Sequence, residues 1–168
     1  MGSSGGGNHF VEFGIAKIEN PENEWKLEKG EYFAVLSHSG SRGLGANIAK
    51  HYTYLATKQC PLPKNVQHLA WLDLNTHDGQ EYWLAMNLAG EYAKACHDDI
   101  HGRIAKALGK RIVVNIENHH NFAWKEMVNG KECIVHRKGA TPAGEGQLGI
   151  IPGSMTAPGY IVRGKGNA

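Results

Sequence analysis

Three histidines stand in settings where a side chain could bind a metal ion. His9 follows three glycines in GGGNHFVEFG, His38 opens HSGSRGLG, and His120 lies in NHHNF. Neutral imidazole nitrogens bind zinc, copper, iron or nickel, and three of them form a usable partial coordination sphere. Their separations match no local zinc-finger spacing. A histidine at a strand end is also commonly an ordinary polar residue, so spacing leaves a metal site and a structural role both open.

Phosphate binding is the second chemistry that the residue types allow. The loop SGSRGLG (39–45) offers backbone N–H groups, hydroxyls and the guanidinium of Arg42, whose planar fork matches phosphate oxygens. A tight turn with a surface arginine explains the same residues equally well. PGSM (152–155) is a similar polar turn, but it is a weaker indication of phosphate binding than the SGSRGLG loop. Arg137 and Lys138 in HRKG form either a solvated face or a contact for RNA phosphate.

Another histidine pair lies on the longest predicted helix. His97 and His101 are one turn apart, so the pair could bind metal, but the HExxH pattern is absent. We therefore interpret the two as a pair on the helix surface. Their neighbour Cys96 is expected to be a small core residue.

Strands, helices and hairpins must position these groups. The apolar run over 10–18, which follows the glycine turn, favours one strand, and apolar alternation over 31–38 favours a second. Helical spacing predicts a helix over 46–59, ended by the prolines of CPLP, and a longer one over 81–108, where Gly109 supplies a stop.

The rest of the chain favours short strands. The β-branched segment 111–117 predicts a buried strand, and 122–138 predicts a hairpin in which Asn129-Gly130 suits a type I′ turn. Glycine-separated strands are expected within 146–155 and 159–164. The fold class is therefore α+β, with one or two long helices against largely antiparallel strands.

Composition describes an ordinary globular chain that is rich in histidine. Its 168 residues suffice for one domain with a core, expected to span 1–168. A net charge of +2 gives no strong basic field, although a local patch can still bind nucleic acid. No apolar run could span a bilayer, and MGSSGGG lacks the apolar core of a secretory signal. Three well-separated cysteines indicate neither a disulfide framework nor a CxxC site, which favours the reducing cytoplasm.

Five stretches follow one another in a distinctive order, namely GGGNHFVEFG, LSHSGSRGLG, NHHNFAWKE, RKGATPAGEGQLGIIPGSM and YIVRGKGNA. Together they closely resemble the RtcB family of RNA-splicing ligases over nearly the whole chain. The resemblance implies joining of RNA ends with a 2′,3′-cyclic phosphate or 3′-phosphate to 5′-hydroxyl ends, with GTP and divalent manganese. In that family a histidine is guanylated, GMP passes to the RNA 3′-phosphate, and the 5′-hydroxyl displaces it. Two metals can hold the triphosphate and stabilise charge on the transferred phosphoryl group.

The resemblance also implies roles for individual residues. His9, His38 and His120 match metal ligands, and Arg42 matches a residue that binds phosphate of RNA or substrate. Gly159 falls where the family often carries a polar nucleotide contact. The other nucleotide-contacting positions are Asn8, His9, Phe10, Val11, Glu12, His120, Asn121, Pro152, Gly153, Ser154 and Met155.

Two motifs of the family do not occur in this sequence. The Asp-x-Gly-Cys-Gly motif, whose aspartate and cysteine are metal ligands, has no counterpart before Gly5, and the His-Gly-Ala-Gly-Arg motif of the guanylated histidine is missing. His136 in HRKGA lacks that context and is not assigned as the nucleophile.

We therefore expect the middle of a longer ligase, inactive alone but able to bind some manganese or phosphate. A non-enzymatic metal- or nucleotide-binding module and one half of a split ligase are the alternatives. Strands that lack their partners would leave open edges, which favour association.

Overall fold

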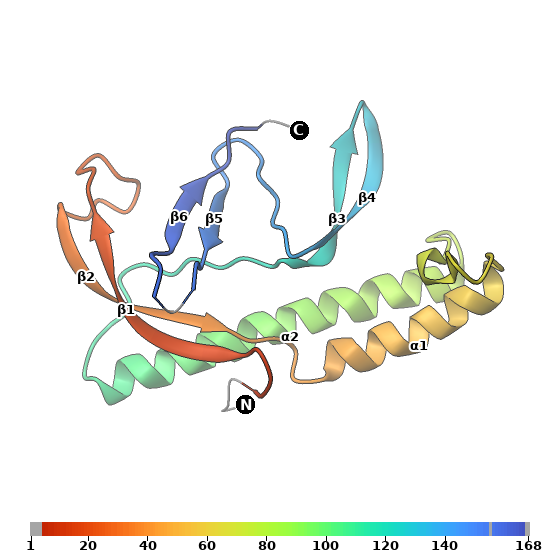
Figure 1. Ribbon diagram of the computed structural model, residues 1–168, viewed down its shortest axis with the longest axis horizontal. Helices are drawn as coiled ribbons and strands as arrows, with labels where there is room; N and C mark the ends of the chain where they lie inside the picture. The colour runs from red at the N-terminus through yellow and green to blue at the C-terminus, as the bar shows by residue number, and fades with distance from the viewer. Residues whose placement is uncertain (1–4, 155, 167–168) are drawn as a thin grey trace. The chain divides into compact units, whose positions relative to one another are not determined.

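The computed structural model describes residues 5–154 and 156–166 and divides into two compact units, Met1–Val113 and Val114–Ala168 (Figure 1). The expected α+β class is confirmed. The first unit contains β1 (Phe10–Ile18), β2 (Gly30–His38), α1 (Leu44–Gln59), the short helix η1 (Gln67–Leu69) and α2 (His77–Ala107), and the second contains β3 (Asn121–Val128), β4 (Lys131–Lys138), β5 (Leu148–Ile151) and β6 (Tyr160–Arg163).

The strands β1 and β2 form an antiparallel hairpin whose register runs from Phe10 opposite His38 to Ile18 opposite Gly30. The start of β1 therefore lies beside the end of β2. At the other end, Asn23 stabilises the connecting loop, because its side chain donates to the Leu27 carbonyl at 2.7 Å and accepts from the Leu27 N–H at 3.1 Å. Both strands that the sequence predicted here are confirmed.

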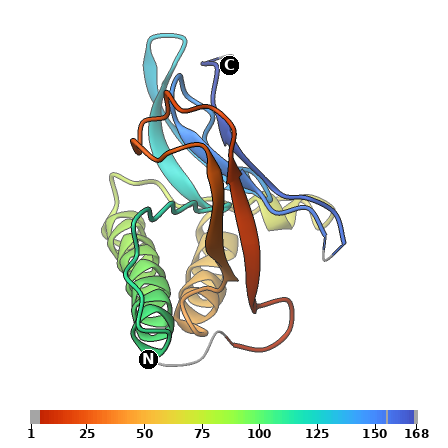
Figure 2. The ribbon, with the colours of Figure 1, turned by 90° about the vertical axis from the view of Figure 1, so that its left-hand side faces the viewer.

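Two helices provide the packed part of the first unit, where α1 runs beside α2 (Figures 1 and 2). The rings of Tyr52 on α1 and Tyr82 on α2 lie 5.1 Å apart. Cys96 is 3% exposed, which confirms its expected place in the core. The other buried apolar residues of the helices are Tyr52, Ala56, Ala89 and Ile100. Gly109, just after α2, has φ 62° and fits the expected helix stop. None of the described helices is long and apolar enough to cross a membrane.

The second unit consists of two separate antiparallel hairpins. In the first, β3 pairs with β4 from Asn121 opposite Lys138 to Val128 opposite Lys131. Asn129 and Gly130 connect them with φ of 50° and 76°, so the predicted type I′ turn fits. In the second hairpin, β5 pairs with β6, as expected for the short glycine-separated strands.

One predicted strand is wrong. Residues 111–117 form no strand and join none of the three two-stranded sheets. β-Branched residues favour a pleated conformation, but a strand forms only where a neighbour satisfies its backbone N–H and carbonyl groups. No described strand pairs with this segment, and Val113 is 61% exposed.

Candidate metal and phosphate site

The hairpin register brings His9 and His38 together. His9 directly precedes β1, and His38 is the last residue of β2. Their ring centroids lie 5.6 Å apart with the planes at 63°. The ring of Phe10 stacks on His38 at 5.6 Å and 24°. Two of the three predicted metal ligands therefore share one end of one hairpin, and both are half-buried.

The ring of His9 has an unsatisfied nitrogen. Its Nδ1 is buried and makes no hydrogen bond within the described residues. A buried polar atom without a partner costs about 1 to 3 kcal/mol. Coordination of a cation would satisfy that nitrogen, because neutral imidazole binds metals through its ring nitrogen lone pair. The His9 ring thus has a nitrogen that could hold a divalent cation, although imidazole by itself does not select which one.

Glycines allow the backbone to approach these rings. Gly5 has φ 112°, and a β-carbon there would overlap His9 Nδ1 and Arg42 Nη1. A β-carbon at Gly40 would lie 3.8 Å from His9 Nε2. Gly5 is therefore required both by its backbone conformation and by the space that the His9 and Arg42 side chains fill.

Arg42 lies directly before the positive end of a helix. It has φ 56° and is followed by Gly43 with φ 89°, the N-cap of α1. The hydroxyl of Ser41 accepts a hydrogen bond from the Gly45 N–H at 2.8 Å. The first turn of α1 carries no acidic side chain. An exposed guanidinium beside a helix N-terminus is an arrangement that suits a phosphate group.

The remaining nucleotide-contact positions of the first unit divide between two faces of the hairpin. Side chains alternate along a strand, so Phe10 and Glu12 lie on the face of β1 that carries His38 on β2. Val11 lies on the opposite face, opposite Ser37. Asn8 is exposed in the turn before β1. Glu12 therefore lies on the same face of the hairpin as His38, and Val11 lies on the other face.

The other predicted site residues belong to the second unit. His120 is exposed just before β3, and its carbonyl accepts from the Gly139 N–H at 2.6 Å. Asn121 begins β3 and pairs with Lys138. Gly153 has φ 67° and stands in the connection between β5 and β6. Exposed positions in the same connection are Pro152, Ser154 and Gly159, while Met155 lies outside the described residues.

The predicted pair of phosphate contacts, Arg137 and Lys138, is divided by the hairpin. Arg137 donates from Nη1 and Nη2 to the two carboxylate oxygens of Glu126, at 2.5 and 2.7 Å. Its guanidinium lies 5.3 Å from the centre of the Trp124 ring. Lys138 is exposed at the end of β4. Lys138 is therefore the more accessible cation, and the RNA role of Arg137 stays a prediction.

The interpretation of His97 and His101 as a surface pair is wrong. Both side chains are half-buried, and their rings stack at 6.5 Å and 17°. His101 Nε2 lies 2.8 Å from the Ser37 hydroxyl oxygen on β2. Sequence spacing could not reveal this contact, because Ser37 and His101 belong to elements that meet only in the folded chain.

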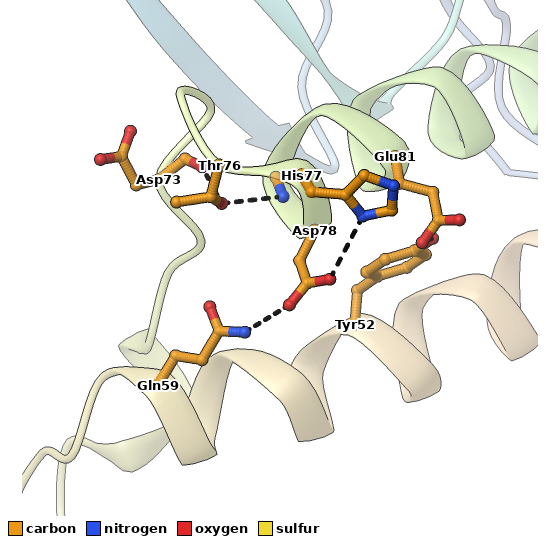
Figure 3. A network of polar contacts seen from close by, with 8 residues as sticks. Tyr52, Gln59, Asp73, Thr76, His77, Asp78 and Glu81 are labelled. Atoms are coloured by element: carbon orange, nitrogen blue, oxygen red, sulfur yellow. Dashed lines mark hydrogen bonds and ion pairs between the residues drawn. The ribbon is translucent and has the colours of Figure 1, made fainter.

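A group that sequence reasoning missed lies at the start of α2. One ligand atom from each of His77, Asp78 and Glu81 lies within 4.8 Å of the others, and this is the one such group of three found in the described part of the chain. Figure 3 shows its carboxylates engaged by α1: the Gln59 amide donates to Asp78, and the Tyr52 hydroxyl donates to Glu81 at 2.9 Å.

These contacts describe a junction between the two helices. Burial, and then the hydrogen bond to Glu81, raises the pKa of the Tyr52 phenol above its ordinary value, so the hydroxyl remains a donor. His77 itself has an 88% exposed side chain. The helical spacing of the three residues was the only sequence signal for this group. Their polar contacts with α1 give the group a structural role in joining the two helices.

Known proteins match the chain along its whole length. The family described as tRNA-splicing ligase RtcB matches residues 1–168. The RNA-splicing ligase RtcB1 of Escherichia coli is 33% identical over 99% of this chain. The tRNA-splicing ligases RtcB of Thermococcus kodakarensis and Nanoarchaeum equitans are each 32% identical, over 98% and 100% of it. The chain spans only 41%, 40% and 41% of these three relatives, respectively.

Proposed function

The chain belongs to the RtcB family of tRNA-splicing ligases, and we propose that it contributes metal- and phosphate-binding groups to an RNA-joining reaction. The substrates are RNA ends with a 2′,3′-cyclic phosphate or 3′-phosphate and ends with a 5′-hydroxyl. GTP and Mn²⁺ are the cofactors. Support for this proposal comes from the family match together with the groups gathered at one end of the β1–β2 hairpin.

Metal binding is the role proposed for the histidines. His9 and His38 would hold Mn²⁺, and the metal role proposed for His120 is the one that the family implies. When bound, the ion would draw phosphate oxygens together and neutralise part of their charge. The stacked Phe10 ring restricts rotation of His38, and the close glycine backbone holds the ring of His9 in place.

Phosphate and nucleotide binding is the role proposed for the neighbouring groups. Arg42 and the first turn of α1 would bind a phosphate of GTP or RNA, because both present hydrogen-bond donors and positive potential. Lys138, which is exposed at the end of β4, keeps its own proposed role as a contact for RNA phosphate. The nucleotide-contact positions implied by the family are part of the same proposal.

The observation that carries the proposal is the His9–His38 ring pair with its unsatisfied Nδ1. A buried nitrogen without a partner is costly in a purely structural histidine. The same nitrogen is useful where a cation binds, so the metal interpretation explains both the proximity of the rings and the missing hydrogen bond.

The test is a titration of the chain with Mn²⁺ in the presence and absence of GTP. We expect saturable Mn²⁺ binding that His9→Ala or His38→Ala removes and that His68→Ala, a change at an exposed position, leaves unchanged. Radiolabelled GTP should bind without forming a covalent adduct, because the sequence has no His-Gly-Ala-Gly-Arg motif. Binding that is indifferent to His9 and His38 would contradict the proposal, as would a guanylate adduct on this chain.

A further inference from the structure

Ser37 connects the candidate metal ligands to the long helix. It directly precedes His38 on β2, and its hydroxyl oxygen lies 2.8 Å from His101 Nε2 on α2. Because neighbouring side chains of a strand point to opposite faces, Ser37 and His38 project to opposite sides of the hairpin. The contact with His101 therefore reaches β2 from the face opposite His38.

His101 is itself well fixed. It follows Ile100, which is 8% exposed, on a helix of 31 residues. Its ring stacks on that of His97 one turn earlier. A hydrogen-bonding group on a packed helix holds a neighbouring element more precisely than a group on a loop. Since its Nε2 is occupied by the Ser37 hydroxyl, the ring acts as a support for the strand.

The end of β2 needs such support. Its only partner strand in the described chain is β1, and an isolated two-stranded hairpin is marginally stable in water. A small rotation of the last residues of β2 would move the ring of His38 away from that of His9. The Ser37–His101 hydrogen bond opposes that rotation, because it ties the residue beside His38 to α2.

We propose that His101 is a positioning residue. Through Ser37, it holds the end of β2 so that His38 and His9 keep the ring arrangement in which they share a metal ion. The metal part of this inference rests on the proposed function. Residues that orient metal ligands without touching the metal typically change metal affinity by about 10- to 100-fold when they are replaced.

The test compares the wild-type chain with His101→Ala, His101→Gln and Ser37→Ala. The glutamine amide can donate to or accept from the Ser37 hydroxyl, so it restores the contact whichever imidazole tautomer is present. His68→Ala is the control for loss of an exposed histidine. Far-UV circular dichroism and thermal unfolding show which variants keep the fold, and Ser37→Ala tests the same contact without altering the helix.

Two measurements follow the histidine rings by nuclear magnetic resonance. Without metal, cross-relaxation between the ring protons of His9 and His38 should weaken in His101→Ala and Ser37→Ala and return in His101→Gln. With Mn²⁺, the concentration that broadens these ring signals by half should rise about tenfold in His101→Ala. His101→Gln should stay near the wild type.

The two measurements distinguish a failure of the proposed function from a failure of this inference. If no ring signal of the wild type responds to Mn²⁺, the proposed function is wrong, and the metal-free spectra still decide the positional claim. Unchanged cross-relaxation in folded His101→Ala and Ser37→Ala overturns the inference. An unchanged Mn²⁺ midpoint in these variants also overturns it, because the contact would then have no effect on the metal pair.

Discussion

Arg137 reaches past the ring of Trp124 to the carboxylate of Glu126, and its two Nη groups each donate a hydrogen bond to one of the Glu126 oxygens. The two side chains come from opposite strands of the β3–β4 hairpin and are 21% and 30% exposed. Paired donors and acceptors in this geometry are stronger than a single-point surface ion pair. The contact therefore fixes the two strands to each other.

The Glu126–Arg137 pair makes the stability of the chain depend on pH. The hydrogen bonds from Arg137 lower the pKa of the Glu126 carboxyl below its ordinary value of 4.5. The pair thus contributes fully above that value, and its contribution is lost as the pH falls through the lower folded-state pKa. Glu126→Gln should lower the free energy of unfolding by about 1 kcal/mol at neutral pH. The difference from the wild type should shrink below about pH 4.

Urea unfolding at several pH values measures this effect. Glu132→Gln on the same hairpin is the matched control, because Glu132 pairs with Lys125 at 3.5 Å with side chains 63% and 49% exposed. Exposed pairs contribute little, so this variant should resemble the wild type throughout. If Glu126→Gln and Glu132→Gln lowered the free energy of unfolding equally, the paired hydrogen bonds between Arg137 and Glu126 would add no stability beyond that of an exposed ion pair.

His9 should be replaceable without loss of stability but not without loss of metal binding. His9→Leu removes the buried Nδ1 that lacks a hydrogen bond. The metal-free chain should therefore be unchanged or up to about 1 kcal/mol more stable. Mn²⁺ binding, followed by electron paramagnetic resonance, should be lost. A destabilised metal-free variant would instead mark His9 as an ordinary structural residue.

Two neighbouring glycines should respond differently to the same substitution. Gly5→Ala places a methyl group where His9 Nδ1 and Arg42 Nη1 lie, at a φ that L-residues rarely adopt. We expect weaker binding of both Mn²⁺ and inorganic phosphate, measured by calorimetry. A β-carbon at Gly6 would meet no atom within 4 Å, so Gly6→Ala should bind both normally. Equal behaviour would mean that the packing against Gly5 does not matter for binding.

The start of α2 should depend on the Thr76 hydroxyl. This oxygen accepts from the Gly79 N–H at 3.2 Å, and the chain at Thr76 is extended, as expected of an N-cap. Thr76→Ala should lower the free energy of unfolding by about 1 kcal/mol, whereas Thr76→Ser should keep most of it. Thermal unfolding of the two variants measures the difference, and similar losses would indicate that packing of the methyl group matters more than the cap.

The open hairpins should promote association. Each sheet in the described part of the chain has two strands, and the β1–β2 hairpin exposes Phe13, Ile15 and Phe33 at 61%, 67% and 63%. Size-exclusion chromatography should show concentration-dependent oligomers, and Phe13→Lys should shift them toward the monomer. A monodisperse wild-type monomer at all concentrations would contradict this prediction.

Local chemistry was sufficient to predict much of the fold. The apolar run over 10–18 predicted β1, the prolines after Gln59 predicted the end of α1, and Asn129-Gly130 predicted the turn of the β3–β4 hairpin. These features depend on neighbouring residues, whose conformational preferences act whatever the rest of the chain does. The strand predicted for 111–117 did not form, because β-branched residues form a strand only beside a partner strand, and local sequence does not show whether a partner is present.

The sequence by itself determined the family, the α+β class and the identity of the histidines worth considering. Only the tertiary structure decided that His9 meets His38, that Arg137 is engaged by Glu126, and that His101 contacts Ser37. The first and last of these relations join residues distant along the chain. Hairpin register and helix packing set the distances between them, and no spacing in the sequence encodes such distances directly.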